Sequence, residues 1–413
     1  MSELMSVDDA VQRVLSRIRA LPSEEIGLVD ALGRVLAEDV IAEENIPPFA
    51  NSSMDGYAVR SADLAGASWE HPVRLAVVDD IAAGRVSDRT IGAGETARIM
   101  TGAPLPPGAD AVVQVELTDA TWTRDDTASV MASVGILHST STGDNVREAG
   151  EDMRAGQVVL HAGTVLRPQD MGVLVSLGHT HVRVVRQPRV AIIATGDELV
   201  DMGQPLGPGQ IRNSNSYVVA GLVEQLGGVP IRLPIAGDQL DAVRERFVEA
   251  LTAQPDLIIS TAGVSVGAHD LVRTVIEELG ELSLWRVNLR PGKPLAYGHV
   301  RGVPFFGLPG NPVSTMVTFD LFVRPALLKQ AGRPITVPVA KVIVNEEMEF
   351  DGRETYMRVT LREQDGALIA ETTGTQSSGA LLSMVVADGL LIVPAGVKHV
   401  AAGTELSVRL LRA

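Results

Sequence analysis

The chain has 413 residues, more than one ordinary hydrophobic core accommodates, so its length predicts several domains. A net charge of −16, an aromatic content of only 3% and the lack of a basic stripe argue against nucleic acid and anionic membranes as partners, and the absence of cysteine excludes disulfides, zinc–cysteine sites and a thiol nucleophile. Neither a signal peptide nor an apolar run of about 18 residues occurs, so we expect a cytoplasmic protein.

The N-terminal part of the chain combines helices with a strand-like region. Residues 6–20 predict an amphipathic helix with a capping pattern at its start. A short strand is expected over residues 35–41, and a strand-like pattern with glycine and proline turns covers 73–116. Pro168 fits the first position of a helix that runs to Gly178. We therefore expect a small β-rich insertion in this part of the chain.

Strands and helices alternate from Arg189 to Gln330. The predicted strands are 190–195, 231–235, 257–260, 284–289 and 303–307. The predicted helices are 214–227, 240–251, 271–279 and a long one after Pro312. This alternation predicts a parallel sheet with helices on both faces, and ligands of such sheets bind at the C-terminal ends of the strands. Three loops follow strands there: TGDEL, TAGVSVGAHD and LPGNP.

The sequence of the C-terminal part predicts β structure only. Pro334 and Pro338 mark a linker, and five strand-like runs follow without a convincing helix: VAKVIV, YMRVTL, LIAETT, LLIVPA and LSVRLL. Their spacing suggests a small β-barrel or a sandwich.

Five acidic residues lie in or near predicted turns: Asp55, Asp152, Glu198, Asp238 and Asp270. A single carboxylate in a turn is usually a solvated cap. Several carboxylates on the loops of one sheet, however, would make an oxygen-rich site for Mg²⁺.

Basic residues gather in the segment WRVNLRPGKP. Arg286 and Arg290 are four residues apart on one predicted strand, so both side chains would point to the same face, and Lys293 follows in the turn. The segment is either a solvated strand end or a clamp for an anion, since arginine makes bidentate contacts with oxyanions.

The loop after the third strand contains GVSVG, which fits the GxSxG pattern around Ser265. One interpretation is the nucleophile elbow of a hydrolase, which needs a later acid and a histidine such as His299 or His399. The β-rich tail does not fit that fold. The alternative is a glycine turn whose backbone N–H groups, including that of Gly267, cradle phosphate.

Nine motifs in order carry a family resemblance. They are PPFANSSMDGYAVR, IMTGAPLPPGADAVVQVE, VREAGEDMRAG, IATGDEL, TAGVSVGAHD, RPGKPLAYG, FGLPGNPVS, DGRETYMRV and TGTQSSG. Together they span essentially the whole chain, which resembles the molybdopterin molybdenumtransferases, the MoeA family that includes the gephyrin E domain.

The resemblance implies a homodimer of four-domain chains. The expected domains are a discontinuous linker domain (1–45 and 145–182), a β-rich insertion domain (46–144), a molybdopterin-binding three-layer α/β domain with a mostly parallel sheet (183–330) and a C-terminal β-barrel (331–413). The implied reaction inserts molybdate into adenylylated molybdopterin with Mg²⁺ as cofactor and releases AMP. The molybdopterin adenylyltransferase is an expected transient partner, and a non-catalytic gephyrin-like scaffold is the alternative.

The resemblance also implies roles for individual residues. The catalytic set is Asp55, Thr101, Asp152, Glu198 and Asp270, of which Asp55 and Thr101 would face the α/β domain of the partner subunit. Metal ligands would be Glu198, Asp238 and Asp270. Substrate-binding residues would be Gly196, Ser265, Gly267, Arg286, Arg290, Lys293, Pro309, Pro312, Arg358 and Ser378.

Two departures from the family pattern bear on these roles. The family carries lysines where this chain has Arg286 and Arg290, and the two residue types are not interchangeable at a shaped site. Ser377 stands where glycine is common in the family, which affects the placement of Ser378.

Overall fold

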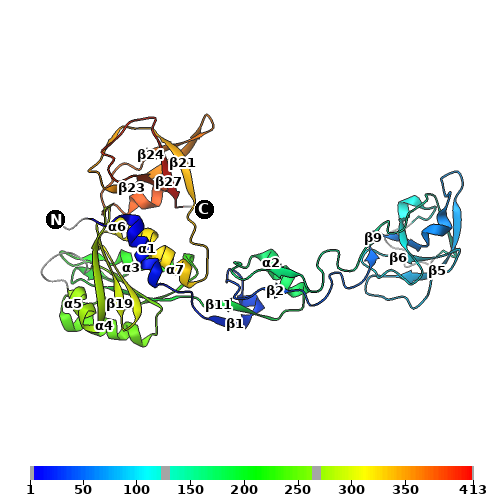
Figure 1. Cartoon of the computed structure of the whole chain (residues 1–413), viewed down its shortest axis with the longest axis horizontal. Helices are drawn as coiled ribbons and strands as arrows, with labels where there is room; N and C mark the ends of the chain where they lie inside the picture. The colour runs from blue at the N-terminus through cyan, green and yellow to red at the C-terminus, as the bar shows by residue number, and fades with distance from the viewer. Residues whose placement is uncertain (1–3, 122–130, 263–270, 412–413) are drawn as a thin grey trace. The chain divides into compact units, whose positions relative to one another are not determined.

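The computed structural model describes residues 4–121, 131–262 and 271–411, and the chain divides into two compact units (Figure 1). Unit 1 comprises residues 1–37, 163–166 and 182–413, and unit 2 comprises residues 38–162 and 167–181. In the described residues, no helix combines the length and the apolar character that crossing a membrane requires.

Unit 2 is built around a five-stranded sheet. Across the sheet the strands are β7 (Ala111–Gln114), β4 (Gly56–Val59), β6 (Glu95–Ile99), β5 (Val73–Ile81) and β8 (Ser133–Ile136). Both faces are covered, because Tyr57 and Val59 of β4 join one apolar cluster while Ala58 joins another. The β-rich character predicted for this region is confirmed.

Shorter elements complete unit 2. They are the pairs β2 (Val40–Ile41) with β10 (Val158–Leu160) and β3 (Asn51–Ser52) with β9 (Val146–Arg147), and the helix α2 (Pro168–Ser176). Pro168 occupies the first turn of α2 as predicted, and Asp170 caps the helix by accepting from the Arg167 backbone N–H at 2.9 Å.

The main sheet of unit 1 has six strands, of which the first four are parallel. In order they are β15 (Val229–Arg232), β12 (Arg189–Ala194), β16 (Leu257–Thr261), β20 (Val303–Leu308), β19 (Pro294–Val300) and β17 (Gly280–Arg286). Val190 and Ile192 of β12 join one core cluster and Ala191 and Ile193 the other, so β12 is buried on both faces.

Helices cover the two faces of this sheet. One cluster includes residues of α1 (Val7–Arg17) and α3 (Ser214–Gln225), and the other includes residues of α4 (Leu240–Thr252) and α5 (Leu271–Leu279). Figure 1 shows α1 and α3 on one side of the sheet and α4 and α5 on the other. The predicted three-layer, mostly parallel α/β architecture is confirmed.

The end of this sheet differs from the prediction in two ways. β19 was not expected; it forms an antiparallel hairpin with β20. The expected single strand over 284–289 is wrong, because β17 ends at Arg286 and the chain then turns, with the Val287 N–H donating to the Lys293 carbonyl at 3.0 Å. Arg290 lies on a separate strand, β18 (Leu289–Arg290), so it and Arg286 do not share a strand face.

The long helix after Pro312 contains an unpredicted π turn. It consists of α6 (Pro312–Thr318), the π turn η4 (Phe319–Val323) and α7 (Arg324–Gln330). All five residues of η4 are buried. A π turn inserts one residue into the helical repeat, so it rotates the following side chains relative to a regular helix.

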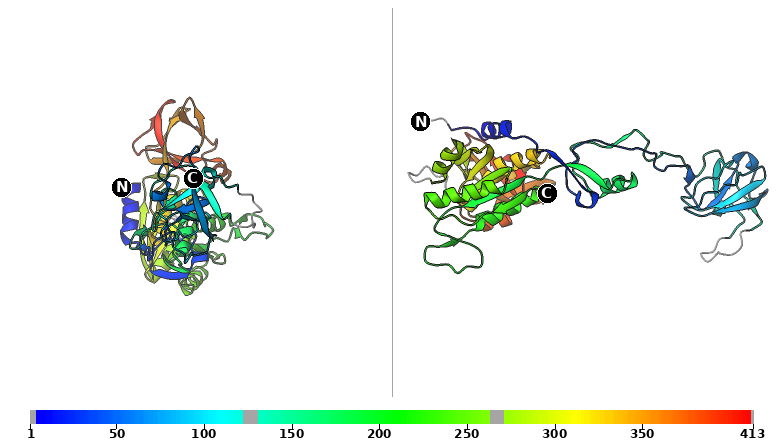
Figure 2. Two further views of the ribbon diagram at one scale, coloured as in Figure 1. Left: turned by 90° about the vertical axis from the view of Figure 1, so that its right-hand side faces the viewer. Right: turned by 90° about the horizontal axis from the view of Figure 1, so that it is seen from below.

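The C-terminal part of unit 1 is a closed barrel. Its five strands are β21 (Val339–Val344), β24 (Ala367–Thr372), β23 (Glu354–Gln364), β25 (Gly389–Val393) and β27 (Glu405–Leu410). The eleven residues of β23 pair with both β24 and β25, which closes the ring and decides for a barrel over a sandwich. The left view of Figure 2 shows these orange and red strands as a layer apart from the α/β sheet.

Smaller elements complete unit 1. They are the pairs β1 (Ser23–Gly27) with β11 (His181–Val185), β13 (Leu199–Val200) with β14 (Ile211–Arg212) and β22 (Met348–Glu349) with β26 (His399–Val400), and the helix α8 (Leu382–Val386), which was not predicted. β18 pairs in parallel with β23 and so joins the α/β part to the barrel.

Candidate functional site

A cavity of about 410 Å³ opens where β12 and β16 end. We call it the strand-end pocket. Its described lining is Thr195, Gly196, Glu198, Asp238, Val243, Ala262, Leu271 and Val272. The pocket therefore lies at the C-terminal edge of the parallel strands, where the topology places ligands.

The two acidic residues of the strand-end pocket are held by backbone contacts around them. The Asp197 N–H donates to the Asp238 carboxylate at 3.3 Å, and the Asp238 N–H donates to the Asp197 carboxylate at 3.0 Å. Gly196 has a φ of +142°, and a Cβ added to it would lie 2.3 Å from Glu198 Oε2. Only glycine allows this turn, which brings the Glu198 carboxylate against the backbone.

The loop after β20 borders the same edge of the sheet. The Asn215 side chain donates to the Gly310 carbonyl at 2.7 Å, and Pro312 begins α6. Thr315 donates to the carbonyl of Pro309. Ala262, which precedes the segment 263–270, has a φ of +79°. A non-glycine residue in this left-handed conformation is uncommon.

A second cavity, of about 650 Å³, lies between the barrel and the α/β part of unit 1. We call it the basic pocket, because four cationic residues and one acidic residue line it: Arg290, Lys293, Arg353, Arg358 and Glu349. Ser314, Thr355, Gln376, Ser377 and Ser378 add polar groups. The chain as a whole is acidic, so this excess of cations is a local feature that suits an anion.

Arg290 reaches the basic pocket through the β18–β23 pairing, in which it lies opposite Thr355. Its guanidinium lies 3.7 Å from Asp351. Arg353 also pairs with Asp351, and this hydrogen bond lowers the pKa of the Asp351 carboxyl. Gly292 makes the tight turn before Lys293, because its φ is +106° and a Cβ there would lie 2.5 Å from the Thr318 side chain.

Arg358 is 1% exposed and fastens the loop that carries Ser378. Its guanidinium donates to the carbonyls of Thr375 and Ser377, at 3.1 and 3.0 Å, and to the Ser383 hydroxyl at 3.1 Å. Burial lowers the pKa of Arg358, and the described residues supply it with carbonyl and hydroxyl oxygens rather than a carboxylate. The charge is therefore only partly compensated, and it faces a pocket that an anion would fill.

Unit 2 carries three further predicted residues. The Asp55 carboxylate accepts from the Thr101 backbone N–H at 2.7 Å and from its hydroxyl at 2.8 Å, so these two residues meet as one exposed group. Asp152 is exposed elsewhere in unit 2, next to Met153, and its backbone N–H donates to the Ile46 carbonyl.

Comparison with known proteins identifies the family. Residues 5–178 match the model described as the MoeA N-terminal region (domain I and II), residues 191–329 a probable molybdopterin binding domain, and residues 341–411 the MoeA C-terminal region (domain IV). The chain belongs to the MoeA family.

Relatives of this MoeA protein match over nearly its whole length. It is 38% identical to the Bacillus subtilis protein named molybdopterin molybdenumtransferase, over 98% of this chain and 94% of the relative. It is 37% identical to molybdopterin molybdenumtransferase 2 of Mycobacterium tuberculosis, over 98% of this chain and 99% of the relative. A crystal structure of the molybdopterin biosynthesis MoeA protein from Pyrococcus horikoshii is 32% identical and superposes with a TM-score of 0.85, covering 100% of both chains.

The structure of this chain brings part of the predicted site together. Gly196, Glu198 and Asp238 share the strand-end pocket, and Arg290, Lys293, Arg358 and Ser378 share the basic pocket. Arg286 is exposed at the end of β17 and is not among the residues that line the basic pocket. Ser265, Gly267 and Asp270 lie outside the described residues.

Sequence reasoning missed several polar residues of this MoeA protein. Arg353 and Gln376 line the basic pocket, and Asp197 makes the reciprocal contact with Asp238. The motifs DGRETYMRV, TGTQSSG and TGDEL contain all three, so their position inside motifs is the signal that could have found them. No histidine occurs in the described lining of the strand-end pocket, which gives the hydrolase alternative no support.

Proposed function

We propose that this chain is a molybdopterin molybdenumtransferase, which inserts molybdate into adenylylated molybdopterin and releases AMP to form molybdenum cofactor. The observation that carries the proposal is the basic pocket. The fold brings Arg290 and Lys293 into one cavity with Ser378, which lies 85 or more residues later in the chain. Both substrates are oxyanions, and arginine, lysine and hydroxyl donors are the groups that bind oxyanions.

In this proposal the basic pocket binds an oxyanion of the substrates. Arg290 and Lys293 are exposed side chains that contribute charge and N–H donors, and the Ser378 hydroxyl adds a neutral donor. Arg358 acts as a positioning residue, because its donors already hold the carbonyls of the loop that bears Ser378. Exposed ion contacts contribute about 0–1 kcal/mol each, so affinity depends on several of them converging on one anion.

The strand-end pocket would hold Mg²⁺. Glu198 and Asp238 both line it, and carboxylate oxygens are the ligands that Mg²⁺ prefers. A divalent cation there would offset the negative charge of phosphate oxygens at the cleaved phosphoanhydride. The proposal keeps Asp270 as a third ligand, and Ser265, Gly267, Pro309 and Pro312 as substrate contacts, on the family resemblance alone.

The remaining assignments follow the same resemblance. Asp55, Thr101 and Asp152 would act in catalysis from unit 2, in a homodimer of four-domain chains, and Arg286 would assist substrate binding. A transient complex with the molybdopterin adenylyltransferase in the cytoplasm would deliver the substrate. The pairing of Asp55 with Thr101 is supported by their contact, which places a carboxylate and a hydroxyl side by side.

The test is reconstitution of a molybdoenzyme that lacks its metal. Purified chain, molybdate, Mg²⁺ and adenylylated molybdopterin should restore the activity of the apoenzyme and release AMP, and Glu198→Ala should abolish both while leaving the circular dichroism spectrum unchanged. A chain that binds peptides but never releases AMP would instead be the non-catalytic scaffold, and labelling by a fluorophosphonate would indicate the hydrolase.

A further inference from the structure

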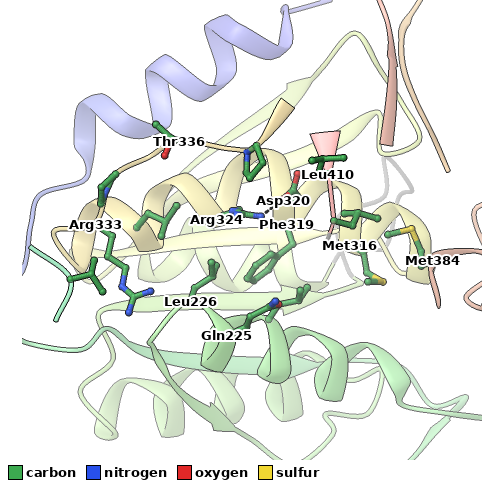
Figure 3. A pocket seen from close by; sticks show the side chains of 16 residues that line it. Gln225, Leu226, Met316, Phe319, Asp320, Arg324, Arg333, Thr336, Met384 and Leu410 are labelled. Atoms are coloured by element: carbon green, nitrogen blue, oxygen red, sulfur yellow. Dashed lines mark hydrogen bonds and ion pairs between the residues drawn. The ribbon is translucent and has the colours of Figure 1, made fainter. Parts of the chain in front are cut away.

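A third cavity in unit 1 is not used by the proposed function. It has a volume of about 390 Å³, within the range of about 300–1,000 Å³ typical of small-molecule sites. Its walls come from the end of α3, the helix that contains η4, α8, the end of β27 and the segment 333–338. Figure 3 shows this cavity, which we call the η4 pocket.

The walls of the η4 pocket are mainly apolar, with charge at one side. Leu226, Phe319 and Met316 line its middle and Met384 one end, and Figure 3 shows these side chains facing the same space as Arg333. The π turn η4 supplies Phe319 and the neighbouring Asp320. Such turns are frequent at functional sites.

Three charged side chains line the η4 pocket, and two of them are cationic. The Asp320 carboxylate accepts from Arg324 at 3.1 Å and from Arg409 at 2.9 Å, so its charge is already matched. The Nε of Arg324 is buried and has no hydrogen-bond acceptor among the described residues. An anion in the cavity cannot reach this buried atom, but the Arg324 side chain as a whole is 26% exposed, so its positive charge still lies at the cavity wall.

Arg333 provides the second cation. It is half-buried, burial lowers its pKa, and its guanidinium donates to the backbone carbonyl of Gly33. Gly227 packs against this guanidinium, since a Cβ added there would lie 3.2 Å from Arg333 Nη2. The guanidinium is thus held in place beside an apolar cavity, and among the described residues it forms no ion pair with a carboxylate.

We propose that the η4 pocket binds an amphiphilic organic anion, whose carboxylate or sulfonate contacts Arg333 and Arg324 and whose hydrocarbon part packs against Leu226, Phe319 and Met316. This site is separate from the basic pocket, so the proposal does not depend on the proposed function. Neutral apolar molecules would leave the charge of Arg333 without an anionic partner and would bind less tightly.

The test uses the full chain and two probes. The fluorescence of anilinonaphthalene sulfonate should rise on binding with a stoichiometry of one per chain, and decanoate should displace it. Decanol, which has the same chain length without the charge, should compete at least about tenfold less well, because a hydrogen bond to a charged group contributes about 1.5–3 kcal/mol. Equal competition by decanol would overturn the proposal.

Variants locate the binding within the chain. Arg333→Gln should weaken decanoate about tenfold, whereas the matched control Arg301→Gln, which removes an exposed arginine in the β19–β20 turn, should leave the affinity unchanged. Leu226→Trp should block the cavity while keeping both arginines. Unchanged affinity in Arg333→Gln and Leu226→Trp would overturn the proposal.

A measurement on the unmodified chain covers the case in which the variants do not fold. Decanoate should slow hydrogen–deuterium exchange in peptides that cover 219–228 and 331–338, and leave the exchange of 189–194 unchanged. The absence of protection in both peptides at saturating decanoate would contradict the site.

Discussion

Replacing the buried Arg358 by methionine separates stability from binding in the basic pocket. Arg358→Met removes three hydrogen bonds from a charged group, a gross loss of roughly 4.5–9 kcal/mol at about 1.5–3 kcal/mol each. Most of this loss is offset, because water can reach the carbonyls of the exposed residues Thr375 and Ser377, and methionine is buried without desolvating a charge. We expect the free energy of unfolding to fall by only about 1 kcal/mol.

The binding effect should be larger than the stability effect. Without its anchor, the loop 375–378 must be ordered when the oxyanion binds, at a backbone cost of about 1–2 kcal/mol per residue fixed. A net loss of about 1.4 kcal/mol corresponds to tenfold weaker molybdate binding, which isothermal titration measures directly. Hydrogen–deuterium exchange over 373–379 should quicken, and that over 257–261 should not change.

The variant Arg358→Lys distinguishes positioning from charge. Lysine keeps the charge, but its single ammonium cannot reach all three acceptors. Hydrogen–deuterium exchange in the loop should therefore stay fast, and the affinity for molybdate should remain low. Wild-type affinity in Arg358→Lys together with fast loop exchange would show that Arg358 acts through its charge. Wild-type affinity and exchange in Arg358→Met would refute the reasoning altogether.

Three further predictions address other parts of the chain. Gly196→Ala should displace Glu198, since the new Cβ would lie 2.3 Å from its carboxylate, so AMP release should fall while molybdate affinity in the basic pocket stays constant. Arg290→Ala should weaken molybdate about tenfold, whereas Arg290→Lys should keep most of the affinity; equal loss in both would point to bidentate geometry instead of charge. Asp170→Asn should destabilise unit 2 by about 1 kcal/mol at neutral pH, because the amide can still cap the helix but loses the charge that pairs with the Arg167 guanidinium and with the helix N-terminus. The hydrogen bond from Arg167 lowers the pKa of Asp170 below 3.8, so this stabilisation is complete above that pH and disappears as the pH falls through the folded pKa; a difference in unfolding midpoint that persists at lower pH would contradict the assignment.

The strands of the α/β sheet were predictable because burial on both faces leaves a continuous apolar run. β12 and β16 are such runs. β19 was not predicted because it begins with Pro294 and because Gly298 and His299 interrupt its apolar residues. Gly298 is nevertheless required there, since a Cβ would lie 2.1 Å from the Glu281 carbonyl of the neighbouring strand. A glycine that is needed because two backbones approach closely adds nothing to the alternation of apolar residues from which a strand is predicted.

The site was predictable only in part, for a related reason. Arg290 and Lys293 share a pocket as the anion-clamp hypothesis requires, but Arg286 does not line it, because the turn between β17 and β18 sends the chain from one sheet to another. Long-range pairing of this kind depends on β23, more than sixty residues later, and no local pattern encodes it. The choice between a barrel and a sandwich was open for the same reason.

The pairing of β18 with β23 also has a consequence for how the chain folds. The N-terminal Met5 forms a bridge with Val287, and the core around α1 includes Tyr356 and Leu390 of the barrel. The first and last parts of the chain therefore complete one core, which cannot close until the ribosome has released the C-terminal strands. We expect the α/β sheet to remain a partly exposed intermediate during synthesis and to gain its final protection in one cooperative step with the barrel.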